Sequence, residues 1–227
     1  MDSILQQQID YYRARAGEYD EWFLRKGRYD RGEVSNSEWF TEAAEVEAAL
    51  EALLPGGHIL EFAGGTGIWS QKLARNCASL TVVDSSPEVL EINRSRLSDP
   101  RASYVLTDIF KWTPDRRYDL VFFSFWLSHV PDERFREFWE LVRQSLKPGG
   151  RVFVMDSRYN QLSTASDHKL NTQDSPVMLR RLNDGREFQI VKIYYEPNTL
   201  GPKLAQLGWR TSFRATANHF VYGTATI

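Results

Sequence analysis

Residues 58–67 read HILEFAGGTG, and this stretch decides the fold. A short apolar run that carries one acid, Glu61, stops in a glycine-rich turn, and the amphipathic stretch IWSQKLARN follows at once. This order predicts a strand, a tight turn and a helix. Glycines without a Cβ let the chain turn sharply and let a ligand lie against bare backbone N–H groups, and a helix start favours negative charge. The turn is either a plain connection or a cradle for a polar, nucleoside-bearing cofactor.

Two acids downstream favour the cradle. The apolar run LTVVD ends in Asp84, and the run SYVLTD ends in Asp108. In a doubly wound sheet the carboxyl ends of the strands face the ligand crevice. A carboxylate after the second strand suits paired ribose hydroxyls, and one after the third suits an exocyclic amine. Each acid taken singly could equally be a helix cap or a solvated loop residue.

These segments resemble the class I S-adenosylmethionine-dependent methyltransferases. Glu61, Gly65 and Gly67 match the family's first motif, in which Ala63 stands where glycine is usual, and Asp84 and Asp108 match its strand-end acids. YDLVFFSFWLSHVP (118–131) and LKPGGRVFVMDS (146–157) match the fourth strand with its loop and the turn into the fifth strand. The resemblance is strong over residues 45–160. It implies an α/β, doubly wound, mostly parallel seven-stranded Rossmann-like sheet with helices on both faces and an antiparallel terminal hairpin.

The resemblance also implies S-adenosylmethionine as the cofactor. The contacts that it assigns within the strand ends and turns are Glu61, Ala63, Gly64, Gly65, Gly67, Asp84, Ser85, Asp108, Ile109 and Ser124. The N-terminal stretch QIDYYRARAGEYDEW resembles the opening of related enzymes whose Tyr and Arg reach the cofactor carboxylate. This adds Tyr12, Arg13 and Tyr19 as candidate contacts, with surface exposure as the alternative.

Two other nucleotide-binding classes fit the residues less well. The dinucleotide fingerprint wants Gly or Ala at its third position, where this chain has Ser70. A phosphate-binding loop of the Walker type needs a closing Gly-Lys-Ser/Thr, which the sequence lacks.

Composition bounds the partners. The chain has 227 residues, which is enough for one sizeable core, and we predict a single domain over residues 1–227. A net charge of −2 with scattered basic residues argues against nucleic acid as a partner. The single cysteine, the absence of a long apolar stretch and the polar start MDSILQQQID predict a cytoplasmic protein without a membrane span. A small organic molecule is the expected methyl acceptor, and nothing in the sequence specifies an oligomeric state.

Two segments are candidates for covering the site. Apolar residues from Leu5 to Tyr19 recur at helical spacing, with a break expected at Gly17, so residues 1–40 form a predicted helical cap. Residues 158–185 are polar and irregular, which indicates a substrate lid or a mobile surface loop. EFQIVKIYY (187–195) is predicted to be a strand. The Arg180–Arg181 pair could flank an acidic substrate group, but we favour a solvated surface pair.

Methyl transfer from a sulfonium requires alignment of three atoms and no metal, and the sequence shows no metal-binding motif. His129, in the loop after the fourth strand, is the candidate general base, with closure of the cofactor pocket as the favoured alternative. Phe125, Trp126 and Tyr159 are candidate walls for a flat acceptor. We therefore expect methyl transfer to O or N of a small aromatic or heterocyclic molecule. C-methylation of a quinone-like ring, or cofactor binding without catalysis, are the alternatives.

Overall fold

A seven-stranded sheet forms the centre of the molecule in a computed structural model that describes residues 2–170 and 175–227. Its strand order is β3-β2-β1-β4-β5-β9-β8, with β5–β9 and β9–β8 antiparallel and the other neighbours parallel. The strands are β1 (His58–Phe62), β2 (Ser79–Asp84), β3 (Ala102–Leu106), β4 (Tyr118–Ser124), β5 (Leu146–Ser157), β8 (Arg210–Ala215) and β9 (Phe220–Thr226). The predicted fold class is confirmed, including the terminal hairpin.

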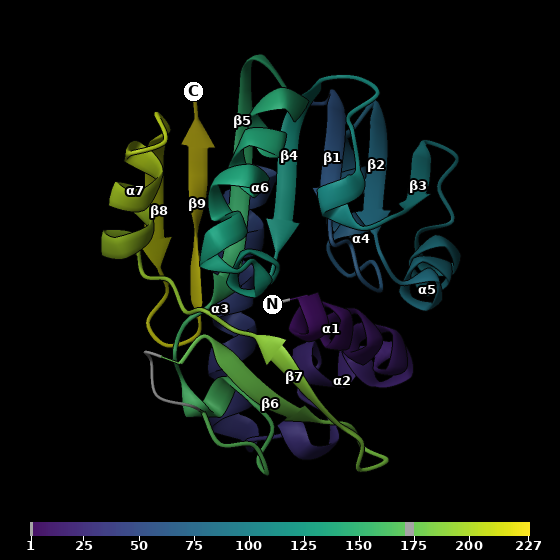
Figure 1. Ribbon diagram of the computed structural model, residues 1–227, viewed down its shortest axis with the longest axis vertical. Coiled ribbons are helices and arrows are strands. Elements are labelled where there is room, and N and C mark those ends of the chain that lie inside the picture. The colour runs from purple at the N-terminus through teal and green to yellow at the C-terminus, as the bar shows by residue number, and fades with distance from the viewer. Residues whose placement is uncertain (1, 171–174) are drawn as a thin grey trace.

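Helices cover both faces of this sheet (Figure 1). The helices are α1 (Asp2–Ala14), α2 (Tyr19–Phe23), α3 (Glu33–Glu51), α4 (Ser70–Leu73), α5 (Pro87–Leu97), α6 (Asp132–Ser145) and α7 (Pro197–Ala205). Helix α6 lies in front of the sheet in this view, and α3 lies behind it. Such double coverage is what continuous apolar strands require, because both of their faces must be removed from water.

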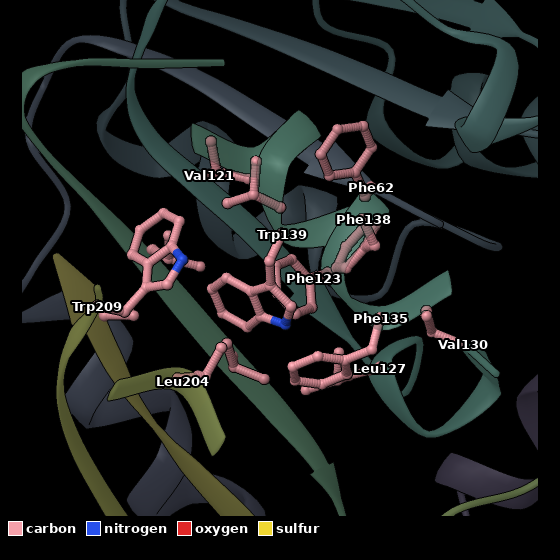
Figure 2. Packing of buried hydrophobic residues seen from close by; sticks show 14 of the residues in the cluster. Phe62, Val121, Phe123, Leu127, Val130, Phe135, Phe138, Trp139, Leu204 and Trp209 are labelled. Carbon is pink, nitrogen blue, oxygen red and sulfur yellow. The ribbon is translucent and has the colours of Figure 1, made fainter. Parts of the chain in front are cut away.

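The core consists of one large apolar cluster on each face. On the α6 face, aromatic rings from β1, β4, α6 and the start of β8 meet edge to face (Figure 2). Phe123 lies 5.1 Å from Phe138 and 5.8 Å from Trp139, and Trp139 lies 5.0 Å from Trp209 (ring centroids). On the other face, Trp39 and Val46 of α3 pack against alternate residues of the same strands. This packing fixes the strand ends, and therefore whatever those ends carry.

Two predicted helices are shorter in the structure. Helix α1 ends at Ala14, and a turn of 3-10 helix that contains Gly17 separates it from α2, as the weak helix propensity of glycine led us to expect. The helix expected after Gly67 is reduced to α4 and one 3-10 turn over Ala74–Asn76.

The expectation of an irregular segment over residues 158–185 is wrong at its end. Val177–Arg181 forms strand β6, which pairs antiparallel with β7 (Glu187–Val191) as a separate two-stranded sheet. The predicted strand 187–195 thus stops at Val191 and belongs to this small sheet. The alternating pattern of VMLRR was hidden among polar neighbours. Residues 171–174 of the predicted lid lie outside the described residues.

Helix α1 packs on the β6–β7 hairpin and not on the main sheet. Tyr11 of α1 shares a small apolar cluster with Met178 and Ile190, and the side chain of Gln8 accepts a hydrogen bond from the backbone N–H of Val191 (3.1 Å). Both elements lie beyond the carboxyl ends of the parallel strands, in the lower half of Figure 1. The predicted cap and part of the predicted lid are therefore in contact with each other.

Candidate active site

A first cavity, named here the strand-end cavity, opens at the carboxyl ends of β1, β2 and β4. Its walls come from the glycine-rich turn, the loops after β2, β3 and β4, and the N-terminal segment: Tyr12, Tyr19, Ala63, Gly65, Asp84, Ser85, Val89, Ile109, Ser124, Phe125, Trp126 and His129. All of these except Val89 are residues that the sequence singled out. The structure thus brings together side chains separated by more than half the chain.

The glycine-rich turn is fixed by Asp84. Gly65, at φ +53°, donates its backbone N–H to one carboxylate oxygen of Asp84 (3.0 Å), and the N–H of Ser86 donates to the other (3.0 Å). Burial raises the pKa of Asp84 above its usual value, while these N–H donors oppose the shift. The result is a shielded carboxylate with unused lone pairs at the cavity wall.

The same turn tests whether a nucleoside-bearing cofactor fits. A Cβ on Gly64 would lie 2.3 Å from a Val82 methyl carbon, so only glycine fits at this position without a shift of the backbone or of Val82. Ala63 takes φ +51°, a left-handed conformation in which a Cβ is strained, and this explains why glycine is usual in the motif. The turn thus offers exposed backbone next to a buried carboxylate that can accept hydrogen bonds from hydroxyl groups. This arrangement fits a ribose and the part of the cofactor that lies against the backbone.

Several predicted contacts lie outside this cavity. Glu61 is buried beneath the turn, where Ser70 donates to it (2.5 Å) and burial raises its pKa to about 8. Asp108 caps the next 3-10 turn through the N–H of Phe110 (3.0 Å). Gly64 and Gly67 border a smaller adjoining pocket with Trp69.

Two further predicted residues lie away from the strand-end cavity and from the second cavity described below. Arg13 forms an exposed ion pair with Glu88 of α5 (3.5 Å). Tyr159 does not line either cavity, and its ring meets Tyr194 edge to face at 5.2 Å.

A second cavity, named here the cationic cavity, adjoins the first. The two share Tyr12, Tyr19, Phe125 and His129. The remaining walls are basic, aromatic and hydroxylic: Tyr11, Arg15, Trp22, Tyr29, Ser157, Arg158, Asn160, Ser163, Thr164, Arg180, Lys192 and Tyr194. No acidic side chain is among these lining residues.

The cations of this cavity differ in their partners. Arg158 pairs with Glu196 (3.0 Å), and Lys192 donates to Asp156 (3.3 Å) and to Ser128 Oγ (2.8 Å). Within residues 2–170 and 175–227, Arg15 and Arg180 have no carboxylate partner. Arg15 is buried and Arg180 is half-buried, and a cation removed from water without a counter-charge is costly, so these two arginines mark a place for an anion.

Arg15 is the more enclosed of the two. Its side chain is 7% exposed, its guanidinium lies over the rings of Tyr19 (5.0 Å), Tyr11 (5.6 Å) and Tyr29 (5.8 Å), and its Nε has no partner among the described residues. Arg180 donates to Thr164 Oγ1 (2.6 Å). Its neighbour Arg181 is exposed, so the surface interpretation of this pair holds for Arg181 alone.

His129 lies on the wall between the cavities. Its Nδ1 is 2.6 Å from the carbonyl oxygen of Val191, and its Nε2 is 2.7 Å from the hydroxyl of Tyr12. Burial, followed by the charges of Lys192 and Arg180, holds the pKa of His129 well below its usual value. The imidazole is therefore neutral at physiological pH.

Comparisons with known proteins decide the family. Residues 59–150 match the model of a methyltransferase domain. Two solved structures of DhpI, one with S-adenosylhomocysteine and one with S-adenosylmethionine and HEP, are 33% and 35% identical to this chain. They cover 100% and 99% of it and 98% of their own chains, each with a TM-score of 0.79.

The chain belongs to the class I S-adenosylmethionine-dependent methyltransferases. It is also 28% identical over 177 residues to the demethylmenaquinone methyltransferase of Tropheryma whipplei, covering 72% of this chain and 73% of that one. The methyl donor is S-adenosylmethionine, as the first motif implied.

The sequence analysis of this methyltransferase did not single out Arg15 or Lys192, and it favoured a surface position for Arg180. Arg15 directly follows α1, Arg180 lies on β6 and Lys192 directly follows β7, and no sequence motif joins the three. The only signal was the Arg180–Arg181 pair, and pairs of this kind are common on solvated surfaces.

The described part of this methyltransferase, residues 2–170 and 175–227, contains no group of His, Cys, Asp or Glu side chains suited to a metal ion. Over the same residues, no helix combines the length and the apolar character needed to cross a bilayer.

Proposed function

We propose that this methyltransferase transfers the methyl group of S-adenosylmethionine to an anionic oxygen of a small acceptor. The observation that carries the proposal is the pair of arginines in the cationic cavity, Arg15 and Arg180, that have no carboxylate partner among the described residues. A phosphonate, phosphate or carboxylate oxygen would supply the missing negative charge. Charge-assisted hydrogen bonds of this kind are also directional, so they would orient the acceptor.

The donor is assigned to the strand-end cavity. There Asp84 would accept the two ribose hydroxyls, and the turn at Ala63 and Gly65 would face the rest of the nucleoside and its amino-acid tail. Ser85, Ile109 and Ser124 would enclose the remaining edges, while Phe125 and Trp126 would close the aromatic side. We keep Glu61 and Asp108 as residues that shape this cavity from behind, through Ser70 and Phe110.

Bound S-adenosylmethionine supplies an electrophilic methyl carbon on a sulfonium. The contribution of the chain is then to hold acceptor and donor in adjoining cavities, because alignment alone lowers the barrier by several kcal/mol. An oxyanion has no proton to lose, so the reaction needs no general base. This agrees with a neutral His129 whose two ring nitrogens already have partners. We therefore assign His129 a positioning role.

An anionic acceptor narrows the earlier expectation of an aromatic or heterocyclic one. A neutral ring such as a quinol would place apolar carbon beside the buried Arg15 and the half-buried Arg180, which is unfavourable. C-methylation of a quinone-like ring remains the second candidate, because a relative of this chain is named as a demethylmenaquinone methyltransferase. In support of an anionic acceptor, DhpI, solved with S-adenosylmethionine and HEP, is similar over 99% of this chain. We propose that residues 1–40 and 158–185 together form the acceptor cap.

Turnover of methyl-labelled S-adenosylmethionine tests the proposal. Small phosphonates, phosphate monoesters and carboxylates would be compared with neutral phenols and a reduced quinone. We expect methyl ester products from at least one anionic class. Methylated phenols or quinone carbons alone would overturn the proposal in favour of the second candidate.

A matched pair of variants tests the cavity. Arg180→Gln should raise the KM for the anionic acceptor about 10- to 100-fold, the range for a lost hydrogen bond to a charged group. Its donor dissociation constant should stay within twofold. Arg181→Gln changes the exposed neighbour on the same strand and should alter neither constant. Equal effects of both variants would contradict the assignment of Arg180.

A further inference from the structure

The hydroxyl of Tyr12 lies where the strand-end cavity meets the cationic cavity. Tyr12 and His129 line both cavities, and the Tyr12 oxygen is 2.7 Å from His129 Nε2. Because the two cavities are assigned to donor and acceptor, an atom on their shared wall is beside the path of the methyl group. What that oxygen can offer depends on where its proton points.

The proton directions in this pair are fixed. A backbone carbonyl can only accept, so the 2.6 Å contact with the oxygen of Val191 requires the hydrogen of His129 to be on Nδ1. A neutral imidazole then has no hydrogen on Nε2, which must accept from the hydroxyl of Tyr12. Burial, together with the neighbouring Tyr11 and Tyr19, raises the pKa of Tyr12 well above its usual value, so the hydroxyl keeps its proton.

Gln8 holds this arrangement from behind. Its side-chain oxygen accepts the N–H of Val191 (3.1 Å), and its side-chain nitrogen donates to the carbonyl of His129 (3.2 Å). The side chain is 4% exposed, and its two contacts leave only one amide orientation. Gln8 thus links the backbones of Val191 and His129 to helix α1. Tyr12 lies on the same helix, four residues after Gln8.

With its proton committed to His129, the Tyr12 oxygen presents only lone pairs to the cavities. Lone pairs repel an oxyanion, so Tyr12 is unsuited to bind the acceptor. They attract the hydrogens of a methyl group on a positive sulfur, since those hydrogens carry partial positive charge. We propose that the Tyr12 oxygen contacts the methyl group of the bound donor and directs it toward the cationic cavity, with His129 and Gln8 as positioning residues.

This inference rests on the proposed placement of donor and acceptor, and differs from the contact to the cofactor carboxylate that the family resemblance implied for Tyr12. It also gives the hydrogen-bonded chain Val191–His129–Tyr12 a task that requires no proton transfer. Contacts between C–H groups and oxygen are individually weak, so the effect belongs to orientation more than to affinity.

The test uses S-adenosylmethionine with a ¹³C-labelled methyl group, bound to the full chain without acceptor. In wild-type protein we expect the methyl proton resonance to move downfield of the free compound. Tyr12→Phe keeps the ring that packs on Tyr11 (5.0 Å) but should remove most of that displacement. The donor dissociation constant should change less than about threefold, and kcat should fall about two- to fivefold.

Tyr195→Phe is the control, because it removes a buried hydroxyl in the apolar core, away from both cavities. It should leave the methyl resonance and kcat unchanged.

A second pair of variants separates a positioning role of His129 from a purely structural one. His129→Asn keeps a donor near the Val191 carbonyl but loses the acceptor for Tyr12, whereas His129→Gln places an amide oxygen near the position of Nε2. We expect the Asn variant to lose the displacement and the Gln variant to regain most of it.

The outcomes are distinguishable. If the methyl resonance in Tyr12→Phe lies where it does in the wild-type protein, the contact is overturned. If His129→Gln restores no more of the displacement than His129→Asn, the role of His129 is overturned. Failure of the wild-type chain to bind S-adenosylmethionine would instead overturn the placement of the donor. Activity toward neutral acceptors alone would overturn the proposed function while leaving the Tyr12 contact standing.

Discussion

The strand-end cavity and the cationic cavity share four residues but are built in different ways. The first draws nine of its walls from residues 63–126, and all of these except Val89 of α5 lie at the end of a strand or in the turn after it. The second draws its four cations from the residues after α1, β5 and β7 and from β6, so three of them come from outside the main sheet. The main sheet thus positions the proposed donor side, whereas α1 and the β6–β7 hairpin position most of the proposed acceptor side.

The largest expected effect tests whether the two parts are separable in stability. Phe138→Ala removes a ring that contacts Phe62 and Phe123 in the main core and should lower the free energy of unfolding by about 3–5 kcal/mol. Ile190→Ala removes apolar volume from the small cluster with Tyr11 and Met178. It should open the cap locally, with hydrogen exchange accelerating at β6–β7 amides and little change at β1 and β4. Equal loss of protection in both regions would show one cooperative unit.

The next effect concerns acid. Burial, then the charges of Arg180 and Arg28, lowers the pKa of His168 to about 4, whereas an unfolded histidine titrates near 6.5. Between those values the unfolded chain binds more protons, so stability falls as the pH drops from about 6.5 to 4. The loss attributable to His168 approaches about 3 kcal/mol at pH 4, and His168→Gln should remove it. Denaturant titrations of the wild-type protein and the variant at pH 7 and pH 4 measure the difference. If the free energy of unfolding falls equally in both proteins between these pH values, other groups cause the acid sensitivity.

The third effect is confined to the strand-end cavity. Asp84→Asn keeps the shape of the side chain but removes its charge. The amide NH2 that replaces one carboxylate oxygen cannot accept a hydrogen bond, so the contact with the N–H of either Gly65 or Ser86 is lost. Donor affinity should fall by about 2–3 kcal/mol, because a charged acceptor is lost for the hydroxyls that it would bind. Calorimetric titration with S-adenosylhomocysteine measures this. An acceptor KM that rises as much as the donor dissociation constant would argue that the two cavities are not independent.

The same contrast explains how far the sequence could be interpreted. The main sheet and its strand-end residues were predictable because the motifs and apolar runs that specify them are short stretches of sequence, as at Gly65 and Asp84. The cationic cavity was not, since Arg15 and Arg180 are 165 positions apart and meet only because α1 packs on β7. Strand β6 itself is stabilised by its partner and by Tyr11, which no local pattern reveals. Arg180 lines the cationic cavity while its neighbour Arg181 is exposed, because successive side chains of a strand point to opposite faces.

The smallest expected effect concerns Arg13, which the family resemblance placed at the donor. The structure pairs it with Glu88 at 3.5 Å, with the two side chains 46% and 45% exposed, and neither lines a cavity. Exposed ion pairs contribute about 0–1 kcal/mol, so Arg13→Gln should shift stability by less than that and donor affinity by less than about twofold. The half-buried pair of Asp20 and Arg96, which also ties the N-terminal segment to α5, provides the comparison, because breaking it should loosen the cap more. If Arg13→Gln weakened donor binding tenfold instead, α1 would have to rotate toward the strand-end cavity when the donor binds. The acceptor side would then be assembled by the donor and not merely placed beside it.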